Sequence, residues 1–265
     1  MNIDLQTAET LEKLHDLAHW LGDPIRDCAI LAEGNVSAAV GADKKTFWLK
    51  ASGSSLVSMR PDEFVLMDTA KALSICDYEN LDDEGITRVL TEAKADQSST
   101  HRPSTEAGLH AACLVEGEAG AVGHTHPVPF LQILCSEKAE EALAGRLFPD
   151  EIVVCGPAPC LVPYVDPGPP LARASREAIR RYKEEWGIPP KVVLLRNHGL
   201  FALGKDVEEV KRVTAMATKV ARALVGTFAM GGPRFLTPEA ANRIHTRPDE
   251  IYRLDKLNQL QLRSK

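Results

Sequence analysis

Strand-like and helical segments alternate along most of this chain of 265 residues. TFWLKASG alternates apolar and polar side chains as a half-buried strand does. Residues 169–186 instead carry apolar side chains at the spacing of an amphipathic helix. Strands that are broken by proline and joined by short turns favour a mixed sheet over a doubly wound parallel one. We therefore expect an α/β fold in one domain, because the length suffices for a single large core.

Local patterns predict the remaining elements. Helices are expected over residues 7–21, 104–115 and 131–143, and from Asp206 to about Leu224. Their capping residues are expected to be Thr7, Ser104, and Asp206 together with Glu209. GAVGHTHP is typical of a short strand, EIVVCGPAP and CLVPYV are rich in strand formers, and KVVLLRNHGLFALG is the longest strand-like run. GNVSAAV contains the small and polar residues of a turn.

The end of the chain differs in composition from the rest. From Gly231 on, the sequence is first rich in proline and arginine and then polar with a helical pattern. We expect one domain over residues 1–230 and a helical tail over residues 231–265. This tail would pack on the same domain or on a neighbouring subunit.

Composition excludes several classes of partner and site. A net charge of −6 provides no basic footprint for nucleic acid or for an anionic membrane surface. No apolar run approaches the roughly 20 residues that span a bilayer, and MNIDLQTAET lacks the features of a secretory signal. The six cysteines are scattered without a CxxC pair, which favours free, buried thiols in a reducing compartment. We expect a cytoplasmic protein that binds neither nucleic acid nor membranes.

Three of the eight histidines occupy positions suited to a metal site. His124 and His126 stand two residues apart in GHTHP, so on a strand their imidazoles share one face. His198 lies in RNHGLF beside Gly199, which allows the backbone to approach closely. Three imidazoles with an open position describe a catalytic divalent site, of which zinc is the commonest occupant. An HxH pair alone is more often a pair of ordinary core or surface histidines, so the hypothesis depends on all three converging.

Glu106 lies in the first turn of the helix expected over residues 104–115. The simplest interpretation of PSTE is a capping serine followed by an acidic residue that suits the helix dipole. Because this helix ends just before the strand of His124, Glu106 could instead contact the metal or move a proton beside it. His110 shares the helical face of Glu106 and either supports the metal site from behind its ligands or packs in the core, and we favour packing. The other histidines are expected at the surface: His15, His19, His101 and His245.

The motifs GNVS, SGSS, PSTE, HTHP and NHG follow one another in an order that resembles the class II aldolase/adducin family over about residues 7–225. TFWLKASGSSL, RPSTEAGLH, VPYVDPGPPLA and PRFLTPEAANRIHTRPDEIYR are similar to the aldolase part of bifunctional rhamnulose-1-phosphate aldolase/alcohol dehydrogenases. The chain is also similar to fuculose-phosphate aldolase. The resemblance implies one three-layer α/β/α domain around a mixed, mainly antiparallel sheet of nine strands. It further implies a cyclic homotetramer with sites between subunits.

The resemblance also assigns roles to residues. It implies zinc, or another divalent cation such as Mn2+, Co2+ or Fe2+, on His124, His126 and His198. It implies that Glu106 is the catalytic acid/base and can also ligate the resting metal. The positions that match the family's substrate-phosphate site are Asn35, Ser52, Gly53, Ser104 and Thr105. The implied partner is a small phosphorylated sugar.

An aldolase of this kind cleaves a ketose 1-phosphate to dihydroxyacetone phosphate and an aldehyde through a metal-stabilised enediolate. Epimerases of the family carry Asp at the position of Glu106, which favours an aldolase. A sugar-phosphate dehydratase, an epimerase or a keto-acid decarboxylase would use the same metal site, and these alternatives stay open. A non-catalytic adducin-like scaffold is a further alternative, although such proteins typically lose metal ligands. Family aldolases also use a tyrosine to protonate the leaving aldehyde, and neither Tyr164 nor Tyr252 can be assigned to that role from the sequence.

Overall fold

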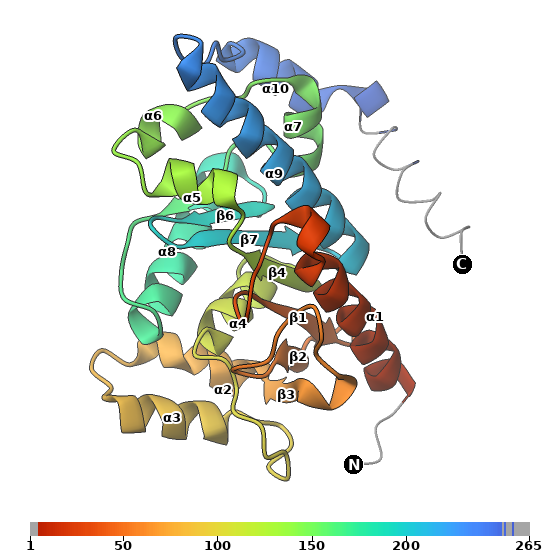
Figure 1. Cartoon of the computed structure of the whole chain (residues 1–265). Coiled ribbons are helices and arrows are strands. Elements are labelled where there is room, and N and C mark those ends of the chain that lie inside the picture. The colour runs from red at the N-terminus through yellow and green to blue at the C-terminus, as the bar shows by residue number, and fades with distance from the viewer. Residues whose placement is uncertain (1–4, 251, 253–255, 257–265) are drawn as a thin grey trace.

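The computed structural model describes residues 5–250, 252 and 256 (Figure 1). Within this part of the chain, seven strands form one sheet in the order β3-β2-β1-β4-β7-β6-β5. Neighbouring strands are antiparallel except for β5 and β6, which are parallel. The strands are β1 (Asn35–Val40), β2 (Thr46–Lys50), β3 (Phe64–Asp68), β4 (Ala121–Thr125), β5 (Cys160–Val162), β6 (Val192–Leu195) and β7 (Gly199–Gly204). This confirms the expected α/β class with a mixed, mainly antiparallel sheet.

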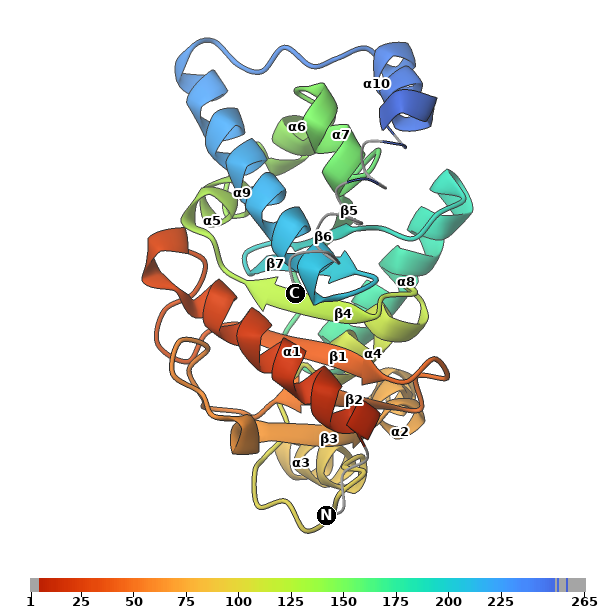
Figure 2. The same ribbon diagram turned by 90° about the vertical axis from the view of Figure 1, so that its right-hand side faces the viewer.

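Helices cover both faces of the sheet. In Figure 2, α1 and α9 lie in front of the sheet while α4 and α8 lie behind it. The α-helices are α1 (Leu5–Gly22), α2 (Thr69–Ser74), α3 (Asp83–Glu92), α4 (Ala107–Val115), α5 (Val128–Leu134), α6 (Ala139–Leu143), α7 (Pro149–Cys155), α8 (Pro169–Trp186), α9 (Val207–Ala229) and α10 (Pro238–Thr246). Short 3-10 turns are η1 (Pro24–Arg26), η2 (Pro61–Glu63) and η3 (Ile75–Asp77).

Each face of the sheet contributes to its own apolar core. Phe47 and Phe201 point to the side covered by α2, α3, α4 and α8. Val36 and Trp48 point to the other side, where they pack with α1, α5 and α9. Successive strand residues alternate between these two cores, as the pleat of a strand requires. The three-layer arrangement thus follows from strands that are apolar on both faces.

Two stretches fold differently from what their sequence patterns predicted. The turn expected in GNVSAAV is wrong, because Asn35–Val40 is the strand β1 in the middle of the sheet, paired on both edges. The long strand expected in KVVLLRNHGLFALG is also wrong, because the chain reverses between β6 and β7. Asn197 sits in the left-handed region with φ 54° at this reversal, a conformation that asparagine tolerates better than most residues.

Helix boundaries also differ from those expected. Pro149–Cys155 forms α7 rather than strand, since proline at its start and acidic residues in its first turn favour a helix. α1 is described from Leu5, so Thr7 lies inside the helix instead of capping it. Residues 131–143 form two short helices, α5 and α6, in place of one. The helix that Asp206 caps continues to Ala229, past the expected Leu224.

The strand count also differs from that of the resemblance. Nine strands were implied, and the described residues form seven. Two further segments of the described chain join the sheet through single bridges: Pro103 pairs with Ala51, which follows β2, and Lys94 pairs with Met67 of β3. One bridge in each segment is too short a pairing to count as a strand.

The segment that follows α9 packs back on α7. The backbone N–H of Leu236 donates to the carbonyl oxygen of Arg146 at 2.8 Å. Phe235 lies over Gly145, where even a Cβ atom would stand 2.5 Å from the phenyl ring. Residues 231–246 therefore contact the same domain, as the sequence allowed. The expected boundary at residue 230 stays a prediction, and most of the tail beyond residue 250 lies outside the described residues.

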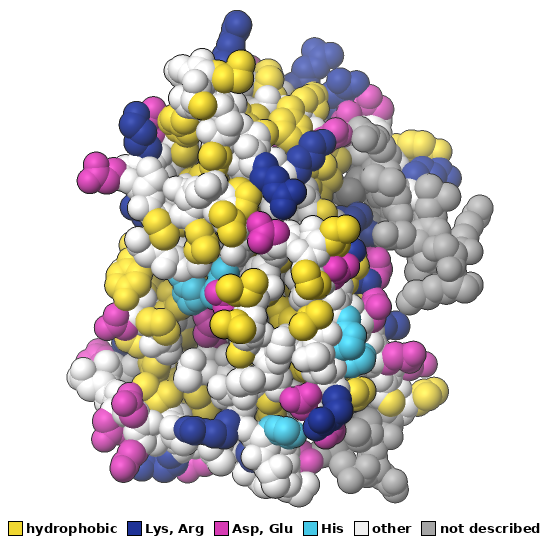
Figure 3. All heavy atoms as spheres, viewed as in Figure 1, with side chains coloured by type: hydrophobic (Ala, Val, Ile, Leu, Met, Phe, Trp, Pro, Cys, Tyr) yellow, Lys and Arg dark blue, Asp and Glu magenta, His cyan; other side chains and the backbone are white. Residues whose placement is uncertain are grey.

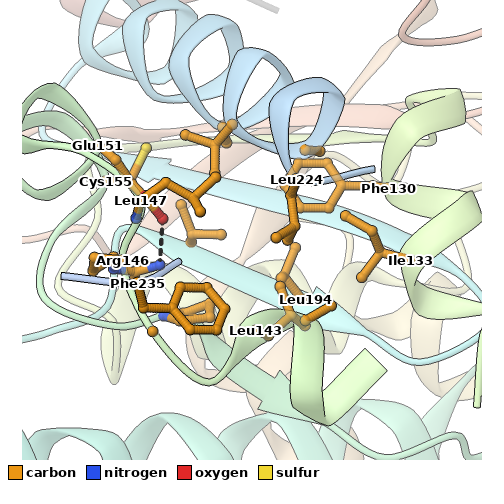
Figure 4. A pocket seen from close by; sticks show the side chains of 17 residues that line it. Phe130, Ile133, Leu143, Arg146, Leu147, Glu151, Cys155, Leu194, Leu224 and Phe235 are labelled. Carbon is orange, nitrogen blue, oxygen red and sulfur yellow. Dashed lines mark hydrogen bonds and ion pairs between the residues drawn. The ribbon is translucent and has the colours of Figure 1, made fainter. Parts of the chain in front are cut away.

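Phe235 also closes a small apolar cavity of about 30 Å3 between α5, α7 and α9 (Figure 4). Arg146 and Glu151 form a buried ion pair at its wall, with Nη1 to Oε1 at 2.8 Å. The second carboxylate oxygen of Glu151 accepts from the backbone N–H of Leu147 at 2.7 Å. The pair therefore ties the start of α7 to the loop that precedes it.

Removing one partner of this buried pair is expected to cost far more than removing an exposed one. Glu151→Ala leaves a guanidinium buried without its counter-ion, and we expect the free energy of unfolding to fall by about 3–5 kcal/mol. Glu141→Ala, which breaks the exposed pair with Lys138, should change it by at most about 1 kcal/mol. Chemical denaturation of both variants measures the difference. Equal losses for the two would contradict the importance of the buried pair.

Among the described residues, no helix is both long and apolar enough to cross a membrane.

Candidate metal centre and active site

His124 stands in the middle of the sheet, on β4 between β1 and β7. It is opposite Asn35 of β1 and Phe201 of β7 in the strand register. Its ring stacks on the ring of Phe201, with centroids 4.1 Å apart. Its Nδ1 lies 3.0 Å from the carbonyl oxygen of Leu200, to which it can only donate. In the neutral ring, Nε2 then keeps a free lone pair.

His126 lies just past the end of β4 rather than on the strand. Its backbone N–H donates to the carbonyl oxygen of Cys28 at 2.8 Å, which holds the chain beside the loop before β1. Its ring turns back so that its Nε2 is 3.0 Å from Nε2 of His124. Its other nitrogen, Nδ1, is 3.8 Å from Oε1 of Glu33. Both imidazoles therefore aim the same nitrogen at one point, although only one of them belongs to the strand.

His198 reaches this point from the turn between β6 and β7. The ligating nitrogens of His124, His126 and His198 all lie within 4.8 Å of one another. Gly199 makes the approach possible, because a Cβ there would stand 2.6 Å from the ring of His126. His126 and His198 keep 18% and 20% of their side-chain surface exposed, so the point is open to solvent on one side. Figure 3 shows histidine side chains at the surface next to acidic and hydrophobic ones.

Glu106 adds a carboxylate oxygen to the three imidazoles. Its Oε1 is 3.6 Å from Nε2 of His124 and 3.4 Å from Nε2 of His198. Ligands of a tetrahedral zinc ion at about 2.0–2.1 Å stand roughly 3.4 Å apart, so these spacings suit one small cation. Oε1 is also buried and has no hydrogen-bond partner among the described residues. A buried carboxylate oxygen without a partner is costly, and a cation at this point would satisfy it.

Burial controls the charge states of the cluster. It lowers the pKa of His124 well below its ordinary value, and the neighbouring His126 and His198 act in the same direction. Burial likewise lowers the pKa of His126, and that of His198 to about 4. The imidazoles are therefore neutral, as metal binding requires. Burial raises the pKa of Glu106 to about 7, although the hydrogen bond from Asn35 acts to lower that pKa.

Asn35 and Ser104 lie directly beside Glu106. The amide nitrogen of Asn35 donates to Oε2 of Glu106 at 2.6 Å and to Oγ of Ser104 at 3.3 Å. The backbone N–H of Glu106 donates to the same hydroxyl oxygen at 3.2 Å. Ser104 therefore holds the turn before α4, and the helix starts at Ala107, three residues later than expected. The predicted phosphate contacts of Asn35 and Ser104 stay predictions.

The two loops with the other predicted phosphate residues lie side by side. The backbone N–H of Ser52 donates to the carbonyl oxygen of Arg102 at 2.9 Å, which joins the loop after β2 to the segment before α4. Ser52, Gly53 and Thr105 are exposed at this junction. Gly53 has φ 85° and nothing within 4 Å of where a Cβ would be. Open space therefore lies beside Gly53, and the phosphate contacts expected of Ser52, Gly53 and Thr105 stay predictions.

Three further residues belong to the site although the sequence did not assign them to it. Lys50, at the end of β2, is only 3% exposed, and its Nζ donates to the carbonyl oxygen of Ala32 at 3.3 Å. Burial lowers its pKa to about 8, while the charge of Glu106 opposes that shift. Glu33 faces His126, and His110 is hydrogen-bonded to Asn35. The signal in the sequence for Lys50 was a charged residue at the end of an otherwise apolar strand, since a cation that is buried there requires a partner.

The two tyrosine candidates and the histidines of α1 make their contacts elsewhere. Tyr164 is 58% exposed and donates to Asp166, and Tyr252 is 63% exposed. Neither is therefore assigned as the acid that protonates the leaving aldehyde. His15 and His19 both contact the carbonyl oxygen of Met59. His110 packs in the core against Phe201 as favoured, and both of its ring nitrogens also have polar partners, Ser37 and Asn35.

The family described as Class II Aldolase and Adducin N-terminal domain matches residues 16–225, which is most of the chain. The chain belongs to this family. Its members' fold, a helix-flanked mixed sheet, agrees with the one described above. L-fuculose 1-phosphate aldolase is a structural neighbour at a TM-score of 0.67 and 16% identity, covering 90% of this chain and 95% of that one. At this identity the likeness shows the fold alone.

Two curated relatives are similar in sequence. The uncharacterized oxidoreductase YuxG of Bacillus subtilis (strain 168) is 27% identical over 168 residues, which are 63% of this chain and 22% of YuxG. This chain therefore spans only about a fifth of that relative's length. Methylthioribulose-1-phosphate dehydratase of Geobacillus kaustophilus (strain HTA426) is 25% identical over 194 residues, which are 71% of this chain and 78% of the dehydratase. The relatives thus differ in the reactions that their names describe.

Proposed function

We propose that this protein is a metal-dependent aldolase. It cleaves a small ketose 1-phosphate to dihydroxyacetone phosphate and an aldehyde. The observation that carries the proposal is the unpartnered, buried Oε1 of Glu106, which faces the imidazoles of His124 and His198 at 3.6 and 3.4 Å. Three neutral imidazoles and a carboxylate with an open side are a donor set for zinc, and also for Mn2+, Co2+ or Fe2+.

A divalent cation bound there supplies Lewis-acid polarisation of the substrate carbonyl. The chain's own groups handle the protons. In cleavage the C4 hydroxyl gives its proton to the carboxylate of Glu106 and its oxygen forms the carbonyl of the aldehyde, while the bond between C3 and C4 breaks and leaves its electron pair on C3. We assign to Glu106 the return of this proton to C3, because its side chain is only 11% exposed and its carboxylate faces the histidine cluster. Membership of the family and the fold of fuculose-phosphate aldolase support this assignment.

The substrate phosphate is assigned to the two adjacent loops. Ser52, Gly53 and Thr105 are exposed there, and the hydroxyl oxygen of Ser104 accepts from the backbone N–H of Glu106. Lys50 supplies the positive charge that a phosphate dianion needs. Its ammonium group is almost fully buried and makes one hydrogen bond within the described part of the chain, to Ala32, so it retains donors for a ligand.

Removing this charge is expected to weaken phosphate binding. Lys50→Met should raise the dissociation constant for inorganic phosphate by about 10- to 100-fold, the equivalent of one charge-assisted hydrogen bond. Lys45→Met removes an exposed lysine from the same strand region, where it pairs with Asp43, and should leave phosphate binding unchanged. Isothermal titration with inorganic phosphate measures both. Unchanged affinity in Lys50→Met would exclude this lysine from the anion site.

The aldolase assignment is tested by product analysis. The zinc-loaded protein is incubated with a panel of ketose 1-phosphates, and triose phosphate is measured by coupled oxidation of NADH. Release of triose phosphate with a matching aldehyde supports the proposal. Absence of cleavage across the panel, with the metal content verified, would refute it.

The second candidate is dehydration of a sugar phosphate. The similarity to methylthioribulose-1-phosphate dehydratase favours it over decarboxylation or epimerisation. Mass spectrometry of the same incubations separates the reactions, because dehydration leaves a product lighter by one water and decarboxylation one lighter by carbon dioxide. A chain that cannot be loaded with any divalent cation would instead favour a non-catalytic adducin-like scaffold.

Assembly and location are proposed on separate grounds. Exposed apolar side chains gather in the loop before β1, beside the histidine cluster, at Ile25, Ile30 and Leu31. Such a patch suits contact between subunits, as in the proposed homotetramer. Light scattering of the purified protein measures the assembly. The six free cysteines, five of them buried, suit the reducing cytoplasm expected from the sequence.

A further inference from the structure

A chain of buried hydrogen bonds leads from β1 through α4 to Glu106. Ser37 Oγ is 2.7 Å from His110 Nδ1, and His110 Nε2 contacts Oδ1 of Asn35. The amide nitrogen of Asn35 then donates to Oε2 of Glu106 at 2.6 Å. Ser37 and His110 are fully buried and Asn35 is 4% exposed, so water does not compete for these contacts. In a dry environment each contact must join a donor to an acceptor.

This requirement sets the direction of every bond. An amide oxygen only accepts, so Nε2 of His110 carries the proton and donates to Asn35. The neutral ring then has a bare Nδ1, which accepts from the hydroxyl of Ser37. Burial supports the neutral ring, because it lowers the pKa of His110 to about 3. If the amide of Asn35 were flipped, its oxygen would face the carboxylate of Glu106, and its nitrogen would face the proton of His110.

The locked amide leaves the two oxygens of Glu106 in different situations. Oε2 is held by Asn35, whose second amide proton is directed at Oγ of Ser104. Oε1 has no partner among the described residues and faces the histidine cluster. Asn35 therefore has both donors and its acceptor engaged within the protein. This does not match the direct phosphate contact that the resemblance implies for it.

We propose that Ser37 and His110 are positioning residues that lock the Asn35 amide and thereby aim Oε1 of Glu106 at the cation site. The inference rests on the proposed metal site, but on no particular substrate or reaction. Its consequence is that Asn35 acts on the carboxylate rather than on the substrate phosphate.

Cobalt binding tests the inference without a substrate. The visible spectrum of bound Co2+ reports the number and geometry of its ligands. His110→Leu removes both hydrogen bonds, and we expect a changed spectrum and a cation affinity lower by about 10- to 100-fold, as for other groups that orient metal ligands. His110→Gln keeps a donor near the position of Nε2 and should restore most of the affinity. Ser175→Ala removes a buried hydroxyl that has no partner among the described residues, and it should change neither property.

Phosphate binding separates the two roles of Asn35. If Asn35 positions Glu106, Asn35→Ala alters the cobalt spectrum and leaves the affinity for inorganic phosphate within about threefold of the wild type. Weaker phosphate binding with an unchanged spectrum would return Asn35 to the phosphate site and overturn the inference. An unchanged spectrum in a folded His110→Leu would overturn it as well.

Imidazole nitrogen NMR of the wild-type protein covers the case in which His110→Leu does not fold. The inference requires His110 to be neutral, with the proton on Nε2 and none on Nδ1. A proton on Nδ1 instead would overturn it. These outcomes are independent of the reaction. A wild-type protein that shows the expected spectra but cleaves no ketose 1-phosphate would refute the aldolase proposal and leave the positioning role intact.

Discussion

Glu106→Gln is expected to lower the turnover of ketose 1-phosphate cleavage by about 10²- to 10⁴-fold, the range for loss of a general acid/base. Glutamine keeps the shape of the side chain, but it cannot accept and return a proton at C3. Its amide also offers the cation site at most one neutral oxygen in place of the buried Oε1. Initial rates from the coupled triose-phosphate assay, taken with the metal content of each preparation, measure the effect.

Glu116→Gln provides the matched control, because Glu116 ends the same helix and pairs with Arg180 far along the chain. It should retain wild-type turnover. Turnover of Glu106→Gln within tenfold of wild type, at equal metal content, would remove Glu106 from the proposed acid/base role.

His198→Ala is expected to lower the affinity for zinc by more than about 100-fold, since loss of a group that merely orients a ligand already costs 10- to 100-fold. Alanine leaves His124 and His126 as a pair from one short segment, with Glu106 as the third donor. Competition with a chromophoric chelator measures the affinity. Turnover should fall in parallel at limiting zinc.

His101→Ala is the control for this variant, because His101 lies outside the group of three histidines. It should bind zinc as the wild type does. Equal zinc affinity in His198→Ala and wild type would mean that the three imidazoles do not share one cation, and the enzymatic proposal would then lose its basis.

Patterns in the sequence predicted the elements whose apolar spacing is regular. The amphipathic helix over residues 169–186 was expected with the bounds that α8 shows, Pro169–Trp186. The acidic cap at Asp206 was expected too, and its side chain accepts from the backbone N–H of Glu209. Both features depend on contacts between residues only a few positions apart, and such contacts are encoded locally.

Elements with short or irregular patterns were predicted less well. Asn35–Val40 is rich in small residues and resembled a turn, yet pairing with strands on both sides makes it the interior strand β1. The run that contains β6 and β7 resembled one strand, because no local signal stronger than Asn197 marks the reversal. In both cases partners distant in the sequence decide the conformation, which is the usual reason that strand propensity fails.

The sequence by itself determined the chemical inventory of this protein: an α/β chain of the class II aldolase/adducin family with His124, His126, His198 and Glu106 as its candidate metal and proton groups. Only the tertiary structure decided how these groups face one another. It directs one oxygen of Glu106 to the imidazoles, commits the amide of Asn35 to the other oxygen, and buries Lys50 nearby. The physical reason is that residue type and spacing are local properties. The direction of a buried donor or acceptor instead depends on strand register and on partners that are distant in the sequence, such as His110 and Asn35, which are 75 positions apart.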